Sequence, residues 1–509
     1  MKTKCGILML IAFITVTCIC NAQDRIQKKY TEQYRPQLHF SPKAHWTNDP
    51  NGMVYYKGAY HLFFQYYPKD IIWGPMHWGH AVSKDLVHWK ELPIALYPDS
   101  LGYIFSGSAV VDSNNTSGFG KKGKIPMVAI FTHHDPKGEK EGRDNFQNES
   151  LAYSLDNGNT WIKYKGNPVL KNPGIKDFRD PKVMWYAKEK KWVMTLATLD
   201  HITFYSSPNL KDWKKESEFG KEIGAHGGVW ECPDLFPLKL NGKTYWILIV
   251  NLNPGGPNGG SATQYFTGSF DGNKFTPVDT QTRWLDYGPD EYAGITWSNT
   301  GNRKIFLGWM SNWEYANQVP TKVWRNAMTI PRELNLEQTD NGLLLKSQPV
   351  AELKNIYTNT TELKNVQVNK NVNLSARVKG FESRYMLKLR FDKLKNYAVR
   401  LSNGKNEELL IGYDAVKNQY YIDRTKAGKM DFQKDFAGRF TAPRLTAVKG
   451  SDITLVVDKA SVEVFADGGL TVMTVIYFPN SDFNNLAITS ADMLKVSSLK
   501  LTGLHSIWK

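Results

Sequence analysis

A degenerate repeat constrains the fold of this 509-residue chain more than any other feature. Each copy is a short apolar stretch, a turn of Ser with Asp or Asn (in the last copy Asp-Gly-Asn), and an aromatic residue that opens the next stretch. The closing aromatics are Trp89, Trp161, Trp213 and Phe275, at intervals of 72, 52 and 62 residues. Repeats of this length, with a few strands in each, are typical of propeller blades rather than of a sandwich. The repeats run nearly to Trp324, which leaves room for about five blades.

The strand pattern continues along the rest of the chain. Short runs of aromatic and β-branched residues alternate with Gly, Asn, Asp and Pro, and no long amphipathic helix is predicted. Of the 16 Trp residues, 15 lie between Trp46 and Trp324 and the last is Trp508, which indicates a domain boundary after Trp324. Beyond Leu363 the alternation is strong, and residues 453–466 predict a hairpin of the kind found in β-sandwiches.

These patterns predict an all-β protein with a five-bladed β-propeller followed by a C-terminal β-sandwich. We expect a signal peptide at 1–22, the propeller at 23–340, a connector at 341–362 and the sandwich at 363–509.

The N-terminus has the pattern of a secretory signal peptide. A basic start precedes an apolar run over residues 7–20, and small residues lie before a cut after Ala22. Export to the periplasm or the outside of the cell is therefore expected. A lipid-anchored form at Cys18 or Cys20 is the alternative, and the residues in front of these cysteines argue against it. No other apolar run is long enough to span a bilayer.

Cysteine and charge counts narrow the range of partners. Of the four Cys, only Cys232 follows the predicted signal peptide, so we expect no internal disulfide and a buried, inert thiol. The net charge is +15, but the Lys residues are scattered along the chain rather than clustered. A solvated surface is therefore favoured over a nucleic-acid site. The oligomeric state stays open.

The stretch from His45 to Gly52 carries the densest chemistry of the chain. Pro50 biases Asp49 toward an extended backbone and offers no N–H to a strand ladder. Asn51-Gly52 supplies turn chemistry. The stretch is interpreted as a strand that stops and presents Asp49 at its end. Asp-Pro-Asn-Gly alone would favour a polar turn without chemistry, and the motifs further along the chain decide against that alternative.

Four further motifs follow Asp49 at the period of the blades. They are Phe105-Ser106-Gly107-Ser108, Arg179-Asp180-Pro181-Lys182, Glu231-Cys232-Pro233-Asp234 and Asp290-Glu291-Tyr292. The steps from Asp49 through Ser106, Asp180, Glu231 and Glu291 are 57, 74, 51 and 60 residues. Because blades repeat around an axis, we expect these positions to meet at one end of a central channel.

The stretch from Trp46 to Gly52 and the first three of the motifs that follow it resemble the signature set of glycoside hydrolase family 32, which contains invertases, inulinases and levanases. The resemblance runs from about Gln37 to the end of the chain. It implies a five-bladed propeller followed by a β-sandwich. Thr47 stands where many members carry Met, and we expect no change in chemistry from this difference.

The resemblance implies a role for each of three acids. Asp49 is expected to be the nucleophile, Glu231 the acid/base and Asp180 the stabiliser of the transition state. Two carboxyl groups of this kind are what a retaining glycosidase requires. The apolar neighbours of Glu231 in the chain are expected to help keep it protonated, and Arg179 is expected to keep Asp180 ionised.

The resemblance also implies a set of substrate-binding residues, although a lone Trp is more often part of a core than of a site. We expect no cofactor, and we expect no metal because no acid or Cys lies at ligand spacing among His45, His77 and His80. The expected substrate-binding residues are Asn48, Gln65, Trp73, Trp78, Phe105, Ser106, Arg179, Trp309 and Trp313.

The activity implied is release of terminal fructose from β-fructans such as levan and inulin, and from sucrose. Trp-bearing segments such as 71–78 suggest walls around one terminal unit, which favours an exo-acting enzyme. One alternative is an endo-acting levanase that gives fructo-oligosaccharides, and another is a sugar-binding propeller without catalysis. The preference among levan, inulin and sucrose stays open, since it depends on loops at the rim. The sandwich is expected to be a scaffold, with glycan binding as the alternative.

Overall fold

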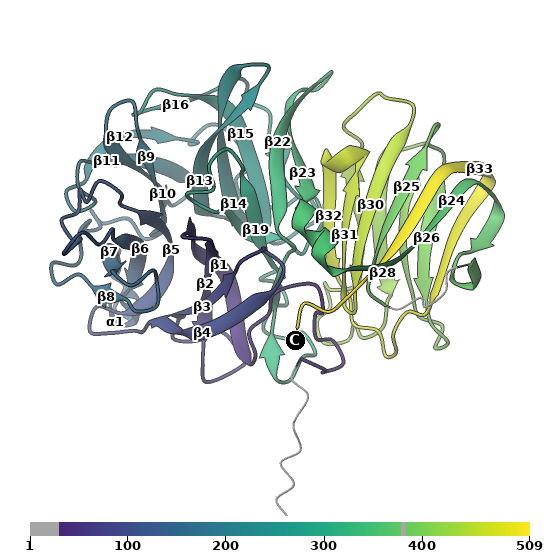
Figure 1. The fold of residues 1–509 in the computed structure, drawn as a ribbon, viewed down its shortest axis with the longest axis horizontal. Coiled ribbons are helices and arrows are strands. Elements are labelled where there is room, and N and C mark those ends of the chain that lie inside the picture. Colours follow the sequence, from purple (N-terminus) through teal and green to yellow (C-terminus); the bar gives the residue numbers. More distant parts are fainter. Residues whose placement is uncertain (1–29, 378–382, 509) are drawn as a thin grey trace, which may run out of the picture.

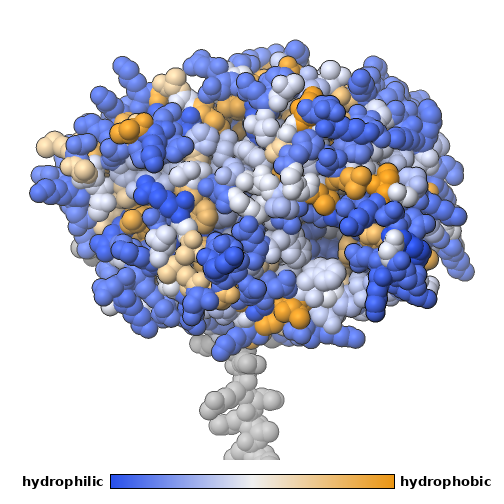
Figure 2. Space-filling model, turned by 180° about the vertical axis from the view of Figure 1, so that it is seen from behind, coloured by the Kyte–Doolittle hydropathy of each residue, from blue (hydrophilic) through white to orange (hydrophobic). Residues whose placement is uncertain are grey.

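The protein consists of a β-propeller and a β-sandwich that lie side by side (Figure 1). The computed structural model describes residues 30–377 and 383–508. The predicted signal peptide at 1–22, with Cys18 and Cys20, lies outside the described residues. Within the described ranges, no helix is both long and apolar enough to cross a membrane. The face seen in Figure 2 is largely hydrophilic, and its apolar residues form small separate patches.

Five antiparallel sheets form the blades of the propeller, and the first strand of each lies innermost. The short strand β20 (Trp324–Arg325) adds in parallel to β1 in the first sheet. The first three blades contain β1 (His45–Tyr56), β2 (Ala59–Tyr67), β3 (His77–Ser83) and β4 (Trp89–Leu96); β5 (Tyr103–Val111), β6 (Met127–His134), β7 (Gln147–Ser154) and β8 (Ile162–Lys163); and β9 (Phe178–Tyr186), β10 (Lys191–Thr198), β11 (His201–Ser207) and β12 (Lys214–Phe219). A short helix, α1 (Pro136–Lys140), follows β6.

The last two blades extend the propeller further along the chain than the sequence indicated. The strands are β13 (Val229–Leu240), β14 (Lys243–Asn253), β15 (Ala262–Phe270), β16 (Phe275–Pro277) and β17 (Arg283–Trp284), then β18 (Tyr292–Thr296), β19 (Ile305–Met310), β21 (Ala327–Met328), β22 (Arg332–Thr339) and β23 (Gly342–Pro349). Residues 342–349 pair with β22 in the fifth blade, whereas the sequence placed them in a connector. The observed connector is the 3₁₀ helix η1 (Ala351–Ile356). The alternating pattern of β23 looks the same in either domain, so the pattern alone misplaced the boundary.

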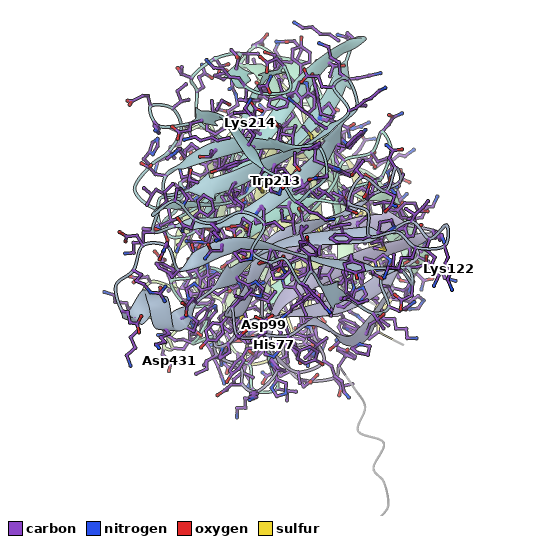
Figure 3. The ribbon with its side chains drawn as sticks, turned by 90° about the vertical axis from the view of Figure 1, so that its left-hand side faces the viewer. His77, Asp99, Lys122, Trp213, Lys214 and Asp431 are labelled. Carbon is purple, nitrogen blue, oxygen red and sulfur yellow. The ribbon has the colours of Figure 1, made fainter. Side chains whose placement is uncertain are left out.

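The repeated Ser–Asp or Ser–Asn turns join the two outermost strands of the first three blades. In the first, Ser83 Oγ donates to Asp85 Oδ1 at 3.1 Å, and the same carboxylate oxygen accepts the N–H of His88 at 2.9 Å. The equivalent pairs are Ser154 with Asp156 and Ser207 with Asn209. Figure 3 places Trp213 and Lys214 where the third of these turns opens β12. These side-chain bonds close the turn that the repeat predicts.

A β-bulge interrupts the innermost strand of every blade. In each case two residues of the inner strand oppose one residue of its neighbour, which leaves the two residues outside the ladder. The bulged pairs are Asn48-Asp49, Phe105-Ser106, Asp180-Pro181, Cys232-Pro233 and Ala293-Gly294. Five bulges at the same height direct these residues toward one end of the channel.

The bulge corrects the expectation that the first strand stops at Asp49. Strand β1 continues to Tyr56, with Pro50 opposite Phe64 immediately after the bulge. In the third and fourth blades Pro181 and Pro233 are themselves bulged residues, where the ladder requires no N–H. The acid–proline motifs therefore mark bulges rather than strand ends.

The C-terminal domain is one continuous sheet that folds into two layers. The long strand β33 belongs to both, since its first half pairs with β26 and its second half with β25. The strands are β24 (Tyr357–Asn373), β25 (Tyr385–Phe391), β26 (Tyr397–Ser402), β27 (Glu408–Asp414), β28 (Gln419–Lys426), β29 (Arg439–Pro443), β30 (Ser451–Asp458), β31 (Ser461–Ala466), β32 (Thr471–Ile476) and β33 (Asn485–Leu504), with the 3₁₀ turns η2 (Ser375–Arg377) and η3 (Asp467–Gly469). Apolar residues between the layers form the core of this domain.

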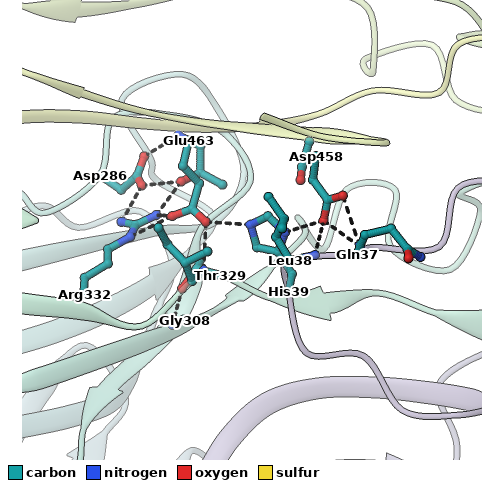
Figure 4. Close-up of polar contacts among 12 residues, drawn as sticks. Gln37, Leu38, His39, Asp286, Gly308, Thr329, Arg332, Asp458 and Glu463 are labelled. Atoms are coloured by element: carbon teal, nitrogen blue, oxygen red, sulfur yellow. Dashed lines mark hydrogen bonds and ion pairs between the residues drawn. The ribbon is translucent and has the colours of Figure 1, made fainter. Parts of the chain in front are cut away.

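A buried polar network joins the sandwich to the propeller (Figure 4). The guanidinium of Arg332 in the fifth blade pairs with Glu463 on β31 and, at 2.9 Å, with Asp286. His39 contacts Asp458 at 2.8 Å and Glu463 at 2.9 Å. Burial by itself lowers the pKa of His39, but the two carboxylates outweigh it and raise the pKa to about 9. His39 is therefore charged at neutral pH, and the network brings two cations together with three acids.

Glu463→Gln should lower the free energy of unfolding by about 3 kcal/mol or more, because Arg332 and His39 would lose a shared carboxylate in a dry interface. Urea unfolding measures the loss. Glu337→Gln, on the strand that carries Arg332, removes an exposed ion pair with Lys346 of 3.0 Å. This control should cost less than about 1 kcal/mol. Equal losses in the two variants would contradict the role of the network.

Candidate active site

Bulged residues of the first three blades, together with Glu231 beside the fourth bulge, line a cavity of about 370 Å³. The three expected acids line it together, although they lie up to 182 residues apart in the chain. Of the twelve sequence-predicted site residues, ten line the cavity: Asn48, Asp49, Gln65, Trp73, Phe105, Ser106, Arg179, Asp180, Glu231 and Trp313. A cavity of this size with convergent acids has the properties of a small-molecule site.

Three hydrogen-bond donors contact the carboxylate of Asp49, one of them the thiol of Cys232, whose Sγ lies 3.6 Å from Oδ2. Ser106 Oγ donates to its Oδ2 at 2.6 Å, and Asn48 Nδ2 donates to its Oδ1 at 2.9 Å. The indole N–H of Trp46 in turn donates to Asn48 Oδ1 at 2.8 Å, which fixes the orientation of the amide. Burial raises the pKa of Asp49, while the bond from Ser106 opposes the rise. The carboxylate is therefore held in a single position with both oxygens bound on one side.

Glu231 is surrounded by polar groups, which differs from the apolar setting that its chain neighbours suggested. Arg179 donates to its Oε1 from Nε at 3.1 Å and from Nη2 at 3.0 Å, and the hydroxyl of Tyr292 donates to its Oε2. The indole of Trp230 instead donates to Ala225 O. Successive side chains of a strand point to opposite faces, so the side chain of Trp230 points away from that of Glu231.

Asp180 lies at the bulge of the third blade with a φ of 66°. The backbone N–H of Cys232, in the bulge of the next blade, donates to its Oδ2 at 3.1 Å. Burial raises the pKa of Asp180 to about 7; Arg179 opposes this, and the charges of Glu231 and Asp49 add to it. Arg179 thus acts on the pKa of Asp180 in the expected direction, but burial outweighs it, since Arg179 approaches Asp180 only to 3.9 Å and pairs more closely with Glu231.

Aromatic side chains form part of the wall. The rings of Trp73 and Phe105 meet edge to face at 6.2 Å between centroids, and Phe105 stacks on His134 at 4.2 Å. On the opposite side, Trp313 packs against Trp46 at 5.9 Å. Such rings offer apolar faces to the C–H groups of a sugar.

Trp78 and Trp309 do not line the cavity, which corrects their expected place in the site. Both are fully buried. The indole N–H of Trp78 donates to Phe105 O at 2.9 Å, and that of Trp309 donates to Thr47 O at 3.1 Å. These two residues therefore support the backbone at two bulges from behind.

Gln65 lies opposite the first bulge, and its Nε2 donates to Asn51 Oδ1 at 2.7 Å. The sequence missed several other lining residues. They are His134, Glu139, Phe146, Gln147, Lys176, Asp177, Val229 and Asn253. Four of these stand at the ends of strands, one lies in α1 and three lie on loops, and they follow no common period, so no repeated spacing could have identified them. Asp177 is closest to a detectable signal, since it precedes the Arg-Asp-Pro motif and its Oδ1 accepts from Arg179 at 2.5 Å.

Comparison with known proteins assigns the chain to a family. It matches the N-terminal domain of glycosyl hydrolases family 32 over residues 39–349 and the C-terminal domain of the same family over 352–503. The chain therefore belongs to family 32 of the glycosyl hydrolases. Membership in a family of glycosidases favours an enzyme over a sugar-binding propeller without catalysis.

Individual relatives are similar over most of their length. The chain is 45% identical to a levanase of Bacillus subtilis, covering 100% of this chain and 76% of that protein. It is 40% identical to an extracellular exo-inulinase of Aspergillus awamori, covering 92% and 96%. The structure of a fructofuranosidase from Schwanniomyces occidentalis complexed with fructosylnystose matches with a TM-score of 0.86 at 32% identity, covering 94% and 99%.

Cys232 should not react with Ellman's reagent in the folded protein at pH 8. Burial, reinforced by the charges of Asp180, Asp49 and Glu231, raises the pKa of its thiol well above the usual value. In urea the protein should expose one more reactive thiol per chain than the Cys232→Ser variant does. Rapid labelling of Cys232 in the native protein would contradict its burial.

Proposed function

We propose that this protein is a retaining, exo-acting β-fructosidase that releases terminal fructose from levan and inulin and also cleaves sucrose. The observation that carries the proposal is the pair of carboxyl groups in one cavity with unlike surroundings. Asp49 accepts from neutral donors, the side chains of Ser106, Asn48 and Cys232. Glu231 is instead bound by Arg179 and the hydroxyl of Tyr292. Two carboxyl groups in separate environments can divide the roles of nucleophile and acid/base.

In the first step Asp49 attacks the anomeric carbon of the terminal fructosyl unit. An ester bond forms to a carboxylate oxygen of Asp49 as the glycosidic C–O bond breaks, and Glu231 gives its proton to the leaving oxygen. In the second step Glu231 takes a proton from water, and the hydroxide displaces Asp49. Two inversions at one carbon give net retention. Arg179 and Tyr292 hold Glu231 between these two steps.

Asp180 is proposed to accept hydroxyl groups of the fructosyl ring and to stabilise the positive charge that develops at the anomeric carbon. The Cys232 N–H fixes its carboxylate at 3.1 Å, so the group is aligned before substrate arrives. The carboxylate and the two other acids surround the same cavity, which concentrates negative charge where an oxocarbenium-like centre forms.

Exo action is proposed from the walls of the cavity. Trp73, Phe105 and Trp313 lie on its rim, and the buried channel lies behind the acids. A chain end can enter such a cavity, whereas the middle of a polymer would need an opening on two sides. The names of the relatives, levanase, exo-inulinase and fructofuranosidase, support β-fructosides as substrates. An endo-acting levanase is the second candidate.

Export of the protein is proposed from its basic and apolar N-terminal sequence, and the relative described as an extracellular exo-inulinase supports it. A cut after Ala22 would remove three of the four Cys residues.

Asp49→Asn, Glu231→Gln and Asp180→Asn should each lower kcat by about 10²- to 10⁴-fold, because each removes a group that acts on the reacting atoms. Fructose release from sucrose, levan and inulin measures the loss, and circular dichroism checks the fold. Asp212→Asn, in an exposed outer turn, should keep full activity. Proton NMR of the first-formed fructose should show the retained anomer. First-formed inverted product would exclude Asp49 as nucleophile.

Early products from levan and inulin should be fructose alone, because only a chain end reaches the acids. Chromatography at a few percent conversion measures this. Sucrose serves as the control substrate, because it carries one terminal fructosyl unit and so does not distinguish exo action from endo action. If a ladder of short fructo-oligosaccharides precedes free fructose, the enzyme is endo-acting, and the proposal that the cavity admits only a chain end is refuted.

A further inference from the structure

A second cavity lies at the opposite end of the inner strands. Its volume is about 380 Å³, similar to that of the candidate active site, and the two share no lining residue. Asp234 lies three residues beyond Glu231 on β13, and Lys182 lies two residues beyond Asp180 on β9. At the rise of an extended strand, the two cavities are on the order of 10 Å apart. Both cavities are therefore lined by the inner strands β5, β9 and β13, with the candidate active site as the front cavity and the second as the rear cavity.

Asp234 in the rear cavity has an unused acceptor. Its Oδ2 accepts from Thr296 N at 2.6 Å and from Thr296 Oγ1 at 2.7 Å, and it lies 3.3 Å from the ammonium of Lys182. Its Oδ1 has no hydrogen-bond partner among the described residues, although the side chain is only 1% exposed. A buried carboxylate oxygen without a partner is costly, so a donor from a bound molecule would stabilise it.

Two ammonium groups face this carboxylate. Lys182 is buried and also donates to Thr296 O. Lys304, half-buried at the same cavity, has no ion-pair or hydrogen-bond partner within residues 30–377 and 383–508. Burial lowers the pKa of Lys304, and the charge of Asp234 opposes the fall. The cavity thus offers one free acceptor on Asp234 and one free donor group on Lys304.

Indole rings complete the lining. Trp185 on β9 and Trp246 on β14 are both partly exposed at this cavity. Trp185 packs edge to face on Trp192 at 4.9 Å, and Trp246 packs on Phe270 at 5.2 Å. The rings are therefore held in place, and each can cover an apolar face of a ligand.

From this geometry we infer that the rear cavity is a second binding site for a neutral sugar of monosaccharide size. The volume falls in the range of about 300–1,000 Å³ that small-molecule sites occupy. A sugar hydroxyl donates to Asp234 Oδ1, another accepts from Lys304, and the ring C–H groups pack on indole. An anion would meet the free oxygen of Asp234, and a cation would meet Lys182 and Lys304. A neutral polyol carries hydroxyl groups that both donate and accept, so it satisfies both free groups without bringing a charge.

Crystals of the protein soaked in fructose test the site directly. We expect sugar density in the rear cavity, with a hydroxyl within hydrogen-bond distance of Asp234 Oδ1. Water or chloride alone in the rear cavity, with fructose in the front one, would overturn the inference. Because the readout is occupancy and not turnover, it is independent of the proposed activity.

Titration of fructose in solution, followed by NMR of the tryptophan indole groups, provides the second test. The signals of Trp185 and Trp246 should shift with a saturable curve, and Lys304→Met should raise the Kd for this shift at least tenfold. Lys188→Met makes the same change in an exposed turn between β9 and β10 and should leave the Kd unchanged. An unchanged Kd in Lys304→Met, or crystal density without a saturable shift, would mean binding at crystal concentration only and would refute the site.

Discussion

The two-against-one β-bulge in each inner strand is the constraint on which the site depends. Side chains alternate between the two faces of a strand, so a regular ladder would carry at most every second residue toward a given neighbour. The bulge places two consecutive residues outside the ladder and turns the strand locally. Asn48 and Asp49 can therefore both serve the same cavity, and the N–H of Cys232 is free to bind Asp180. Proline at these positions costs no ladder bond.

The sequence predicted this arrangement because the bulge leaves a trace at the period of the blades. Steps of 57, 74, 51 and 60 residues between Asp49, Ser106, Asp180, Glu231 and Glu291 follow the observed bulges closely. In the fifth blade the bulge comes after Tyr292, and it is the Tyr292 hydroxyl, not Glu291, that reaches Glu231. The motifs and their spacing are thus enough to predict the propeller and the convergence of the acids.

The motifs and their spacing do not predict the direction in which a side chain points. Trp78, Trp309 and Trp313 look alike in the sequence, yet only Trp313 lines the cavity, since the other two turn inward to bind backbone carbonyls. Arg179 is adjacent to Asp180 but pairs with Glu231 from the next blade. Such partners are set by how neighbouring blades pack, a non-local property that one strand's pattern does not carry.

The sandwich reaches the active site through two short connections. On β32, Thr474 N binds Asp286 at 2.9 Å and Ile476 N binds Asp290 at 2.9 Å, and Tyr292 follows two residues later to hold Glu231. At the N-terminal side, His39 is fixed by acids of the sandwich only six residues before β1 begins. Asp49 thus lies on β1, and Glu231 contacts Tyr292 on β18. The chain just before each of these two strands is bound to the second domain. These contacts tie the first and fifth blades, and with them Asp49 and Tyr292, to the C-terminal domain.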